Sequence, residues 1–287
     1  MLSYRHAFHA GNHADVLKHA VLIALLDHLG QKDKAWSYID SHAGAGLYDL
    51  HGEYASRNAE FEGGIARLWE RTDLPPALAR YVDLVHGLNP DGLLRYYPGS
   101  PWCALQCARP DDHLRLFELH TTDHRLLDRN FAKAGRQVRI ETGDGYLGLR
   151  AVLPPPSRRG LVLIDPSYEI KTDYVRAADA LREALVRFAN GTYLVWYPLL
   201  QTADSRQLLQ QLRSLRPASW LNVTLCVQSP APTGFGMHGS GLFLVNPAWT
   251  LPGLLESALP WLVEALDRKS TRLNSSHWLL SRMPSSA

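Results

Sequence analysis

Short apolar runs alternate with helical patterns along most of this chain, and this alternation limits the fold more than any other feature. Helical patterns separate most of the runs, among them 14–29, 123–134, 173–188 and 205–215. We predict strands at seven of the runs: 36–40, 114–118, 138–141, 161–165, 193–196, 222–227 and 242–246. Strands that alternate with helices pair in parallel and are covered on both faces. The sequence therefore predicts an α/β fold with a seven-stranded, mostly parallel sheet that ends in a hairpin pair.

One interval of the chain interrupts this alternation. Residues 51–95 carry helix patterns, at 60–69 and 76–88, without a convincing strand. We interpret this interval as an inserted helical subdomain, so that residues 1–50 and 96–268 form the main domain.

The last segment, residues 269–287, differs in composition from the rest of the chain. It is rich in serine, has no acidic residue and shows no sustained periodicity. We expect it to be a disordered tail foreign to the native protein, and a basic RNA-binding tail is the alternative.

Composition argues against several classes of protein. The chain has 287 residues, of which 46% are hydrophobic, and its net charge of +2 permits a nucleic-acid partner without requiring one. No apolar run in the sequence is long enough to span a bilayer, and three cysteines suit a reducing compartment. The histidines near the start have no second ligand cluster elsewhere in the sequence to complete a metal site; they are His6, His9, His13 and His19. We therefore expect a cytoplasmic monomer that binds neither a membrane nor a metal.

The buried run 161–164 leads directly into Asp165, Pro166, Ser167 and Tyr168. The carboxylate of Asp165 and the backbone carbonyl of Pro166 can accept hydrogen bonds from the amino group of a nucleobase. The ring of Tyr168 can stack on the face of the same base. This pattern predicts a site that modifies a base.

A second group of residues predicts a pocket for a nucleoside cofactor. The glycine-rich turn 42–46 follows the first strand, where backbone can approach a ligand closely. Glu118 ends the second strand and could accept from both ribose hydroxyls, while Asp144 and Gly145 follow the third strand and could meet an adenine amino group. Taken singly, each acidic residue is more often a helix cap or a solvated turn. Their order along the strand ends favours the pocket, and the lack of a third glycine three places after Gly46 argues against NAD.

Several blocks of the chain resemble the RlmJ family of bacterial 23S ribosomal RNA adenine-N6 methyltransferases, which use S-adenosylmethionine. The resemblance covers about residues 1–266 and is carried by 1–6, 8–19, 42–46, 95–101, 158–161 and 171–174. It implies the Rossmann-like fold of class I S-adenosylmethionine-dependent methyltransferases. It also implies 23S ribosomal RNA as the substrate.

The same resemblance assigns roles to individual residues. Asp165 would be the catalytic residue, and Tyr4 would contact the substrate RNA. Contacts with the cofactor would come from His19, His42, Ser100, Glu118, Asp144 and Gly145, with Lys18 alongside. The family usually has a second proline where this chain has Ser167, and we expect a modest effect of that difference. The catalytic motif leaves two alternatives open: the same chemistry on DNA or on another RNA, and an RNA-binding protein with a weakened catalytic site.

Overall fold

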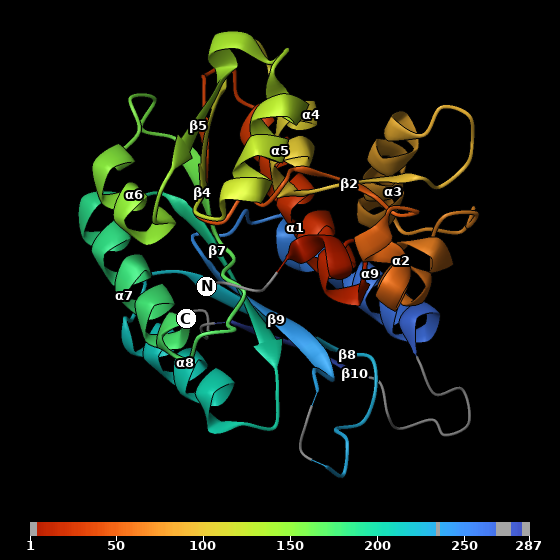
Figure 1. The fold of residues 1–287 in the computed structure, drawn as a ribbon. Coiled ribbons are helices and arrows are strands. Elements are labelled where there is room, and N and C mark those ends of the chain that lie inside the picture. The colour runs from red at the N-terminus through yellow and green to blue at the C-terminus, as the bar shows by residue number, and fades with distance from the viewer. Residues whose placement is uncertain (1–4, 234–235, 268–276, 283–287) are drawn as a thin grey trace.

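The computed structural model describes residues 5–233, 236–267 and 277–282. One eight-stranded sheet crosses the molecule in the order β10-β8-β9-β7-β6-β1-β4-β5 (Figure 1). Its strands are β1 (Ser37–Asp40), β4 (His113–Glu118), β5 (Val138–Thr142), β6 (Gly160–Ile164), β7 (Thr192–Leu199), β8 (Trp220–Cys226), β9 (Gly239–Val245) and β10 (His277–Arg282). All seven predicted strands are therefore confirmed, with small shifts at their ends.

The sheet is parallel at one side and antiparallel at the other. Strands β5, β4, β1, β6 and β7 pair in parallel. Strand β9 pairs antiparallel with both β7 and β8, which confirms the predicted hairpin pair. Because β1 and β6 are neighbours with Asp40 opposite Leu163, the segments that follow them begin side by side at one edge of the sheet.

The eighth strand departs from the expected disorder within residues 277–282, while residues 269–276 and 283–287 of the predicted tail lie outside the described residues. Residues His277–Arg282 form β10, which pairs antiparallel with β8 along its whole length. An unpaired edge on β8 would leave a row of backbone donors and acceptors open, and a short strand from the tail satisfies them. The serine-rich composition of the tail did not indicate this strand, because composition is averaged over all of residues 269–287.

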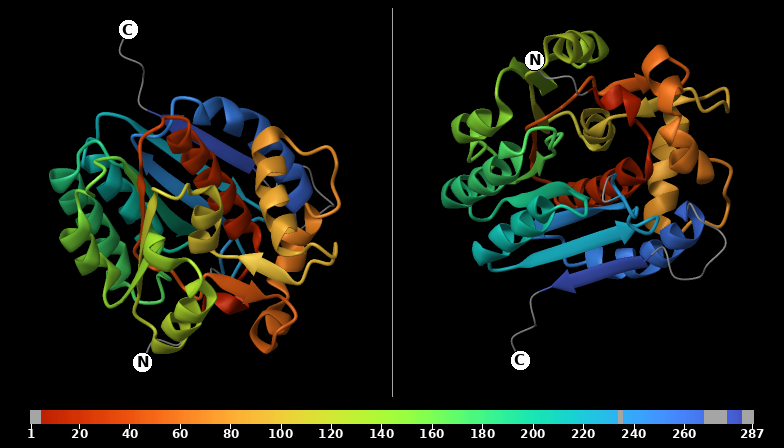
Figure 2. Two further views of the ribbon diagram at one scale, coloured as in Figure 1. Left: turned by 90° about the horizontal axis from the view of Figure 1, so that it is seen from above. Right: turned by 60° about the horizontal axis from the view of Figure 1, so that its bottom comes forward.

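Helices cover both faces of the sheet (Figure 2). One core holds side chains of α1 (His13–Gly30), α3 (Pro76–Leu88), α4 (Ser100–Cys107), α5 (Thr121–Phe131) and α9 (Leu251–Leu266). The opposite core holds those of α6 (Gly145–Val152), α7 (Thr172–Arg187) and α8 (Ala203–Ser214). A short 3-10 helix, η4 (Gly135–Gln137), leads into β5. Within the described part of the chain, none of the helices combines the length and hydrophobicity that a membrane span needs.

Helix α1 is buried along most of its length. Its first turn is capped by Asn12, whose side-chain oxygen accepts from the backbone N–H groups of Ala14 and Asp15 at 2.9 and 3.0 Å. Residues 13–23 are all buried, polar ones included. The helix therefore carries charged side chains into the interior of the protein, where they must find partners.

The interval predicted as an insertion begins and ends at a small second sheet, which was not predicted. Strand β2 (Leu47–Asp49) pairs antiparallel with β3 (Tyr96–Pro98), and α2 (Glu53–Asn58) and α3 lie between them in the chain. The helix predicted at 60–69 is wrong: two 3-10 turns, η2 (Glu60–Gly63) and η3 (Ile65–Arg67), replace it. They are separated at Gly64, where a Cβ atom would lie 2.0 Å from the carbonyl oxygen of Gly11. That close approach is possible only for glycine, and it breaks the helix.

Candidate active site

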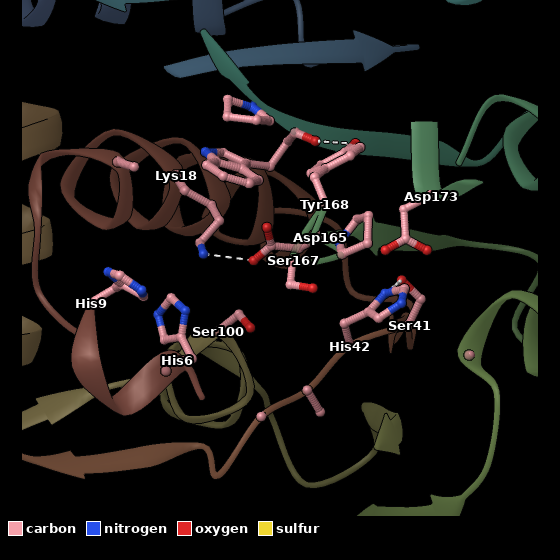
Figure 3. A pocket seen from close by; sticks show the side chains of 18 of the residues that line it. His6, His9, Lys18, Ser41, His42, Ser100, Asp165, Ser167, Tyr168 and Asp173 are labelled. Atoms are coloured by element: carbon pink, nitrogen blue, oxygen red, sulfur yellow. Dashed lines mark hydrogen bonds and ion pairs between the residues drawn. The ribbon is translucent and has the colours of Figure 1, made fainter. Parts of the chain in front are cut away.

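A cavity of about 430 Å³ opens where β1, β4 and β6 end (Figure 3). Its position fits the general rule that open α/β sheets bind ligands beyond the carboxyl ends of their strands. Every predicted site residue within the described ranges lines it: Lys18, His19, His42, Ser100, Glu118, Asp144, Gly145, Asp165, Pro166 and Tyr168. Tyr4 lies outside the described residues. Side chains that are far apart in the sequence are thus brought to one cavity.

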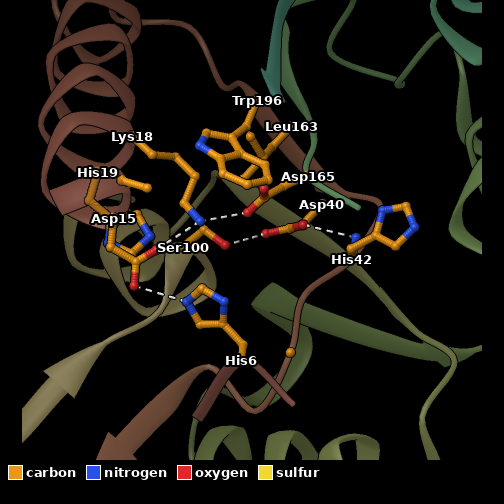
Figure 4. A network of polar contacts seen from close by, with 12 residues as sticks. His6, Asp15, Lys18, His19, Asp40, His42, Ser100, Leu163, Asp165 and Trp196 are labelled. Carbon is orange, nitrogen blue, oxygen red and sulfur yellow. Dashed lines mark hydrogen bonds and ion pairs between the residues drawn. The ribbon is translucent and has the colours of Figure 1, made fainter. Parts of the chain in front are cut away.

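Asp165 follows β6, and its carboxylate faces the cavity and Lys18 (Figures 3 and 4). The side chain is 12% exposed, and its Oδ2 atom accepts a hydrogen bond of 2.6 Å from Lys18 Nζ. Among the described residues, Oδ1 of Asp165 has no hydrogen-bond partner. One oxygen of the carboxylate is therefore fixed by α1, while the other is available to a ligand.

Lys18 also contacts a second buried acid. Its Nζ lies 2.9 Å from Oδ1 of Asp15, and the two side chains are 4% and 1% exposed. Oδ2 of Asp15 accepts from the backbone N–H of Gly11 at 2.9 Å and lies 2.9 Å from Nε2 of His6 (Figure 4). This network ties the N-terminal 3-10 helix η1 (His6–Phe8) to the base of the cavity.

The network fixes the charges of its members. Burial would lower the pKa of Lys18, but the carboxylates of Asp15 and Asp165 outweigh it and raise that pKa. Burial would likewise raise the pKa of Asp15, but His6 and Lys18 outweigh it and hold that pKa well below its usual range. Lys18 is therefore a permanent cation beside the free carboxylate oxygen of Asp165.

Tyr168 has a left-handed backbone, with φ of 53°, which is unfavourable for a residue with a Cβ atom. Its hydroxyl donates to the carbonyl of Trp196 at 2.7 Å, and its ring centroid lies 4.5 Å from that of Tyr174 and 5.9 Å from that of Trp196. The ring is only 8% exposed. These contacts hold the strained turn, and all three rings line the cavity, in which Figure 3 labels Tyr168. Trp196 lies inside a strand, where nothing in the sequence separates it from a core residue.

Glu118 holds the glycine-rich turn from the end of β4. Its two carboxylate oxygens accept from the backbone N–H groups of Gly44 and His120, each at 2.7 Å. Gly44 has a φ of +61°, which glycine adopts without strain. Burial raises the pKa of Glu118 to about 7. Each oxygen keeps a second lone pair, so the predicted role with two ribose hydroxyls is compatible with these bonds.

The carboxylate of Asp144 already has partners within the protein on both of its oxygens. Its Oδ1 caps α6 by accepting from Tyr146 N and Leu147 N at 3.0 and 3.3 Å, and its Oδ2 pairs with Arg176. An adenine amino group that bound Asp144 would therefore share its carboxylate with the backbone of α6 and with Arg176. Next to it, a Cβ atom on Gly145 would lie 1.8 Å from the carbonyl oxygen of Ser41. Glycine at that position lets α6 begin in contact with the turn after β1.

The residues after β1 are held by buried polar bonds. His42 Nδ1 lies 2.8 Å from the Ser41 hydroxyl, and burial lowers the pKa of His42 to about 4, so this ring is neutral. Asp40 accepts from the hydroxyls of Ser100 and Tyr38 at 2.7 and 2.6 Å. Burial raises the pKa of Asp40 to about 6. Sequence reasoning did not single out Asp40, although its place at the end of a buried strand was the available signal.

In the part of the chain that the structure describes, no three or more His, Cys, Asp or Glu side chains are grouped so that they could hold a metal ion. His6 and His9 instead lie beside acidic side chains, with His6 against Asp15 and His9 Nδ1 2.9 Å from Glu60.

Comparisons with known proteins give one consistent result. A family model described as "Ribosomal RNA large subunit methyltransferase D, RlmJ" matches residues 33–280. Ribosomal RNA large subunit methyltransferase J of Escherichia coli K12 is 44% identical over 280 residues, which cover 98% of this chain and 99% of that protein. The protein of the same name from Haemophilus influenzae is 41% identical, over 97% of this chain and 99% of that protein. Among solved structures, protein LPL1258 of Legionella pneumophila is similar, with a TM-score of 0.86 and 36% identity over 95% of this chain and 98% of that one.

Proposed function

Because this chain belongs to the RlmJ family of ribosomal RNA large subunit methyltransferases, we propose that it methylates N6 of a specific adenine in 23S ribosomal RNA, with S-adenosylmethionine as the donor. One observation supports this most directly. The oxygen of Asp165 to which no described residue donates and the glycine-rich turn after β1 line the same cavity, at the ends of two adjacent parallel strands. Donor and acceptor can therefore meet there.

The residues that would hold the cofactor suit its chemistry. Glu118 has a spare lone pair on each oxygen for the ribose, and the neutral rings of His19 and His42 line the cavity. When bound, S-adenosylmethionine supplies a methyl group on a positively charged sulfur. Glu118 ends β4, and Asp144 and Asp165 follow β5 and β6, so the residues that would hold the nucleoside and the acid that would act on the substrate lie along one edge of the sheet.

Asp165 acts on the attacking nitrogen. The lone pair of an adenine amino group is delocalised into the ring, so this nitrogen must be made more tetrahedral before it can attack. Oδ1 of Asp165 and the carbonyl of Pro166 accept hydrogen bonds from its two N–H groups and stabilise the positive charge that develops on it. Lys18 holds the other oxygen of Asp165 and so fixes the direction of the carboxylate. After transfer, Asp165 or water takes the proton from the methylated nitrogen, which is then strongly acidic.

The aromatic rings beside Asp165 suit an extruded base. An adenine inside a duplex cannot reach a cavity of this kind, so it must be unpaired or rotated out of the stack. Tyr168 and Trp196 line the cavity next to Asp165 and can contact the face of the base. Single-stranded or looped RNA is therefore the substrate that fits, and we propose that the protein acts on it as a cytoplasmic monomer.

The test is a methylation assay on defined substrates. Purified protein is incubated with labelled methyl donor and with either unmodified 23S ribosomal RNA or duplex DNA, and the nucleic acid is digested to nucleosides. Label in N6-methyladenosine from the ribosomal RNA is the expected result. Label only in DNA, or RNA binding without label, contradicts the proposal.

An Asp165→Asn variant tests the catalytic assignment. The amide keeps the shape of the side chain but accepts hydrogen bonds poorly and takes no proton, so methyl transfer should fall by about 100-fold or more. Affinity for S-adenosylhomocysteine, measured by calorimetry, should change little. The matched control is Asp111→Asn, an equivalent change at an exposed loop position. Turnover of Asp165→Asn at the rate of that control would remove Asp165 from the catalytic role.

A further inference from the structure

A chain of buried hydrogen bonds runs from the cavity toward the helical segment between β2 and β3. Nδ1 of His19 lies 2.9 Å from the hydroxyl of Tyr97, which lies 3.0 Å from the hydroxyl of Tyr81. The rings of His19 and Tyr97 are stacked, with centroids 5.6 Å apart. All three side chains are buried, and they come from α1, β3 and α3 in that order. In such a setting every polar hydrogen needs an acceptor.

The number of protons on these three side chains selects one direction for the hydrogen bonds between them. The hydroxyl of Tyr97 lies within hydrogen-bond distance of both other side chains, while the hydroxyl of Tyr81 has only Tyr97 as a hydrogen-bond partner among the described residues. If His19 carried its proton on Nδ1 and donated to Tyr97, one of the two hydroxyl protons would be left without an acceptor. If Tyr81 donates to Tyr97 and Tyr97 donates to Nδ1, both hydroxyl protons are used and the ring proton lies on Nε2. The second arrangement leaves no hydroxyl proton without an acceptor, which would be costly. Its one remaining donor, the Nε2–H group, belongs to a side chain that lines the cavity, where water or a ligand can accept from it.

The charge states agree with this count. Burial lowers the pKa of His19 to about 3, so the ring is neutral at physiological pH and carries one proton. Burial raises the pKa of Tyr81 and of Tyr97 well above the ordinary value, so both hydroxyls keep their protons.

Nε2 of His19 is the atom left for a ligand. His19 lines the cavity, Nδ1 is used by Tyr97, and Nε2 has no hydrogen-bond partner among the described residues. Glu118 ends β4, and Asp144 and Asp165 follow β5 and β6. They line the parts of the cavity assigned to the ribose of the cofactor, the adenine of the cofactor and the amino group of the substrate. The part lined by α1 and by Ser100, the first residue of α4, is left for the amino-acid end of the cofactor (Figure 4). The carboxylate at that end accepts hydrogen bonds and has none to give.

We propose that Tyr81 and Tyr97 fix His19 in the tautomer with its proton on Nε2, so that His19 donates to the carboxylate of the cofactor. Tyr81 and Tyr97 are thus positioning residues that act through His19. The helical segment between β2 and β3 supplies this part of the cofactor site through α3 and β3. This inference rests on the proposed function, because it takes the cofactor to be S-adenosylmethionine.

Two ligands separate this role from a merely structural one. S-adenosylhomocysteine carries the carboxylate, whereas 5′-methylthioadenosine has the same nucleoside and sulfur without it. Tyr97→Phe should weaken binding of S-adenosylhomocysteine by about fivefold and leave that of 5′-methylthioadenosine unchanged. Tyr81→Phe should have a smaller effect on S-adenosylhomocysteine, because Tyr97 can still donate to Nδ1. Equal weakening of both ligands by Tyr97→Phe, or no weakening of either, would overturn the proposal.

A direct measurement on the unmodified sequence completes the test. Nitrogen-15 spectra of histidine-labelled protein report which ring nitrogen carries the proton, and the signal of His19 is identified by its loss in His19→Gln. A proton on Nε2 supports the proposal, and a proton on Nδ1 overturns it even if the cofactor binds. If the protein binds no S-adenosylhomocysteine at all, the proposed function fails, while these spectra still decide the tautomer.

Discussion

Replacing Lys18 with Met would remove a buried cation that two carboxylates share. Met has a similar length and no charge, so packing is largely kept while both ion pairs are lost. Asp15 would keep its bonds to Gly11 and His6, whereas Asp165 would lose its hydrogen bond to Nζ. The variant therefore isolates what the ammonium contributes to stability and to the position of the Asp165 carboxylate.

The expected loss of stability follows from burial. Removing one partner of a buried ion pair costs about 3–5 kcal/mol, because the remaining charge is left without compensation. Lys18 and Asp15 are 4% and 1% exposed, which places this pair in the buried class. Since Asp15 keeps two other partners, we expect the free energy of unfolding to fall by about 4 kcal/mol. This is equivalent to a melting temperature lower by roughly 8 °C in a chain of this size.

The dependence on pH has a definite sign. The folded-state pKa of Asp15 is depressed, so its ion pair contributes stability above the unfolded pKa of an aspartate, and that contribution is lost as the pH falls. The difference in free energy of unfolding between wild type and Lys18→Met should therefore be largest near neutral pH and should become smaller below about pH 4.

The assay is urea and thermal unfolding, followed by circular dichroism, of three variants beside the wild type. Lys34→Met removes an exposed lysine and is the matched control. Adding Asp15→Asn to Lys18→Met neutralises the stranded acid and should recover part of the lost stability without restoring methyl transfer. A stability of Lys18→Met within about 1 kcal/mol of the control would refute the assignment of this pair as a buried, interacting one.

Two further outcomes are expected. Glu118 must be ionised to accept from ribose hydroxyls, and burial raises its pKa to about 7, so affinity for S-adenosylhomocysteine should fall up to about tenfold from pH 8 to pH 6. Calorimetry should show this dependence in the wild type and not in Glu118→Gln, and a flat wild-type profile would contradict it. Gly145→Ala would place a Cβ atom 1.8 Å from Ser41 O, so it should lower the melting temperature and weaken cofactor binding. Gly87→Ala, where nothing lies within 4 Å of the added atom, should do neither, and equal behaviour of the two would show that the contact is unimportant.

The sequence was sufficient where the signal was local. Apolar runs of strand length predicted all seven of the strands that compose the sheet apart from β10, and α3 begins and ends where its pattern indicated. Acidic residues at the ends of parallel strands must lie along one edge of the sheet, so Glu118 and Asp165 could be assigned to one cavity before any coordinates were known.

Contacts between distant segments depended on the tertiary structure. The sequence could not show that Lys18 pairs with Asp165, 147 positions later, or that the hydroxyl of Tyr97 lies beside Nδ1 of His19. Nor did serine-rich composition reveal that His277–Arg282 would complete the edge of the sheet. Local patterns record which backbone conformation a segment favours and which face it buries. The partner of a buried charge is decided only when the packed chain removes water from both groups, and for that reason the network of Asp15, Lys18 and Asp165 became visible only in three dimensions.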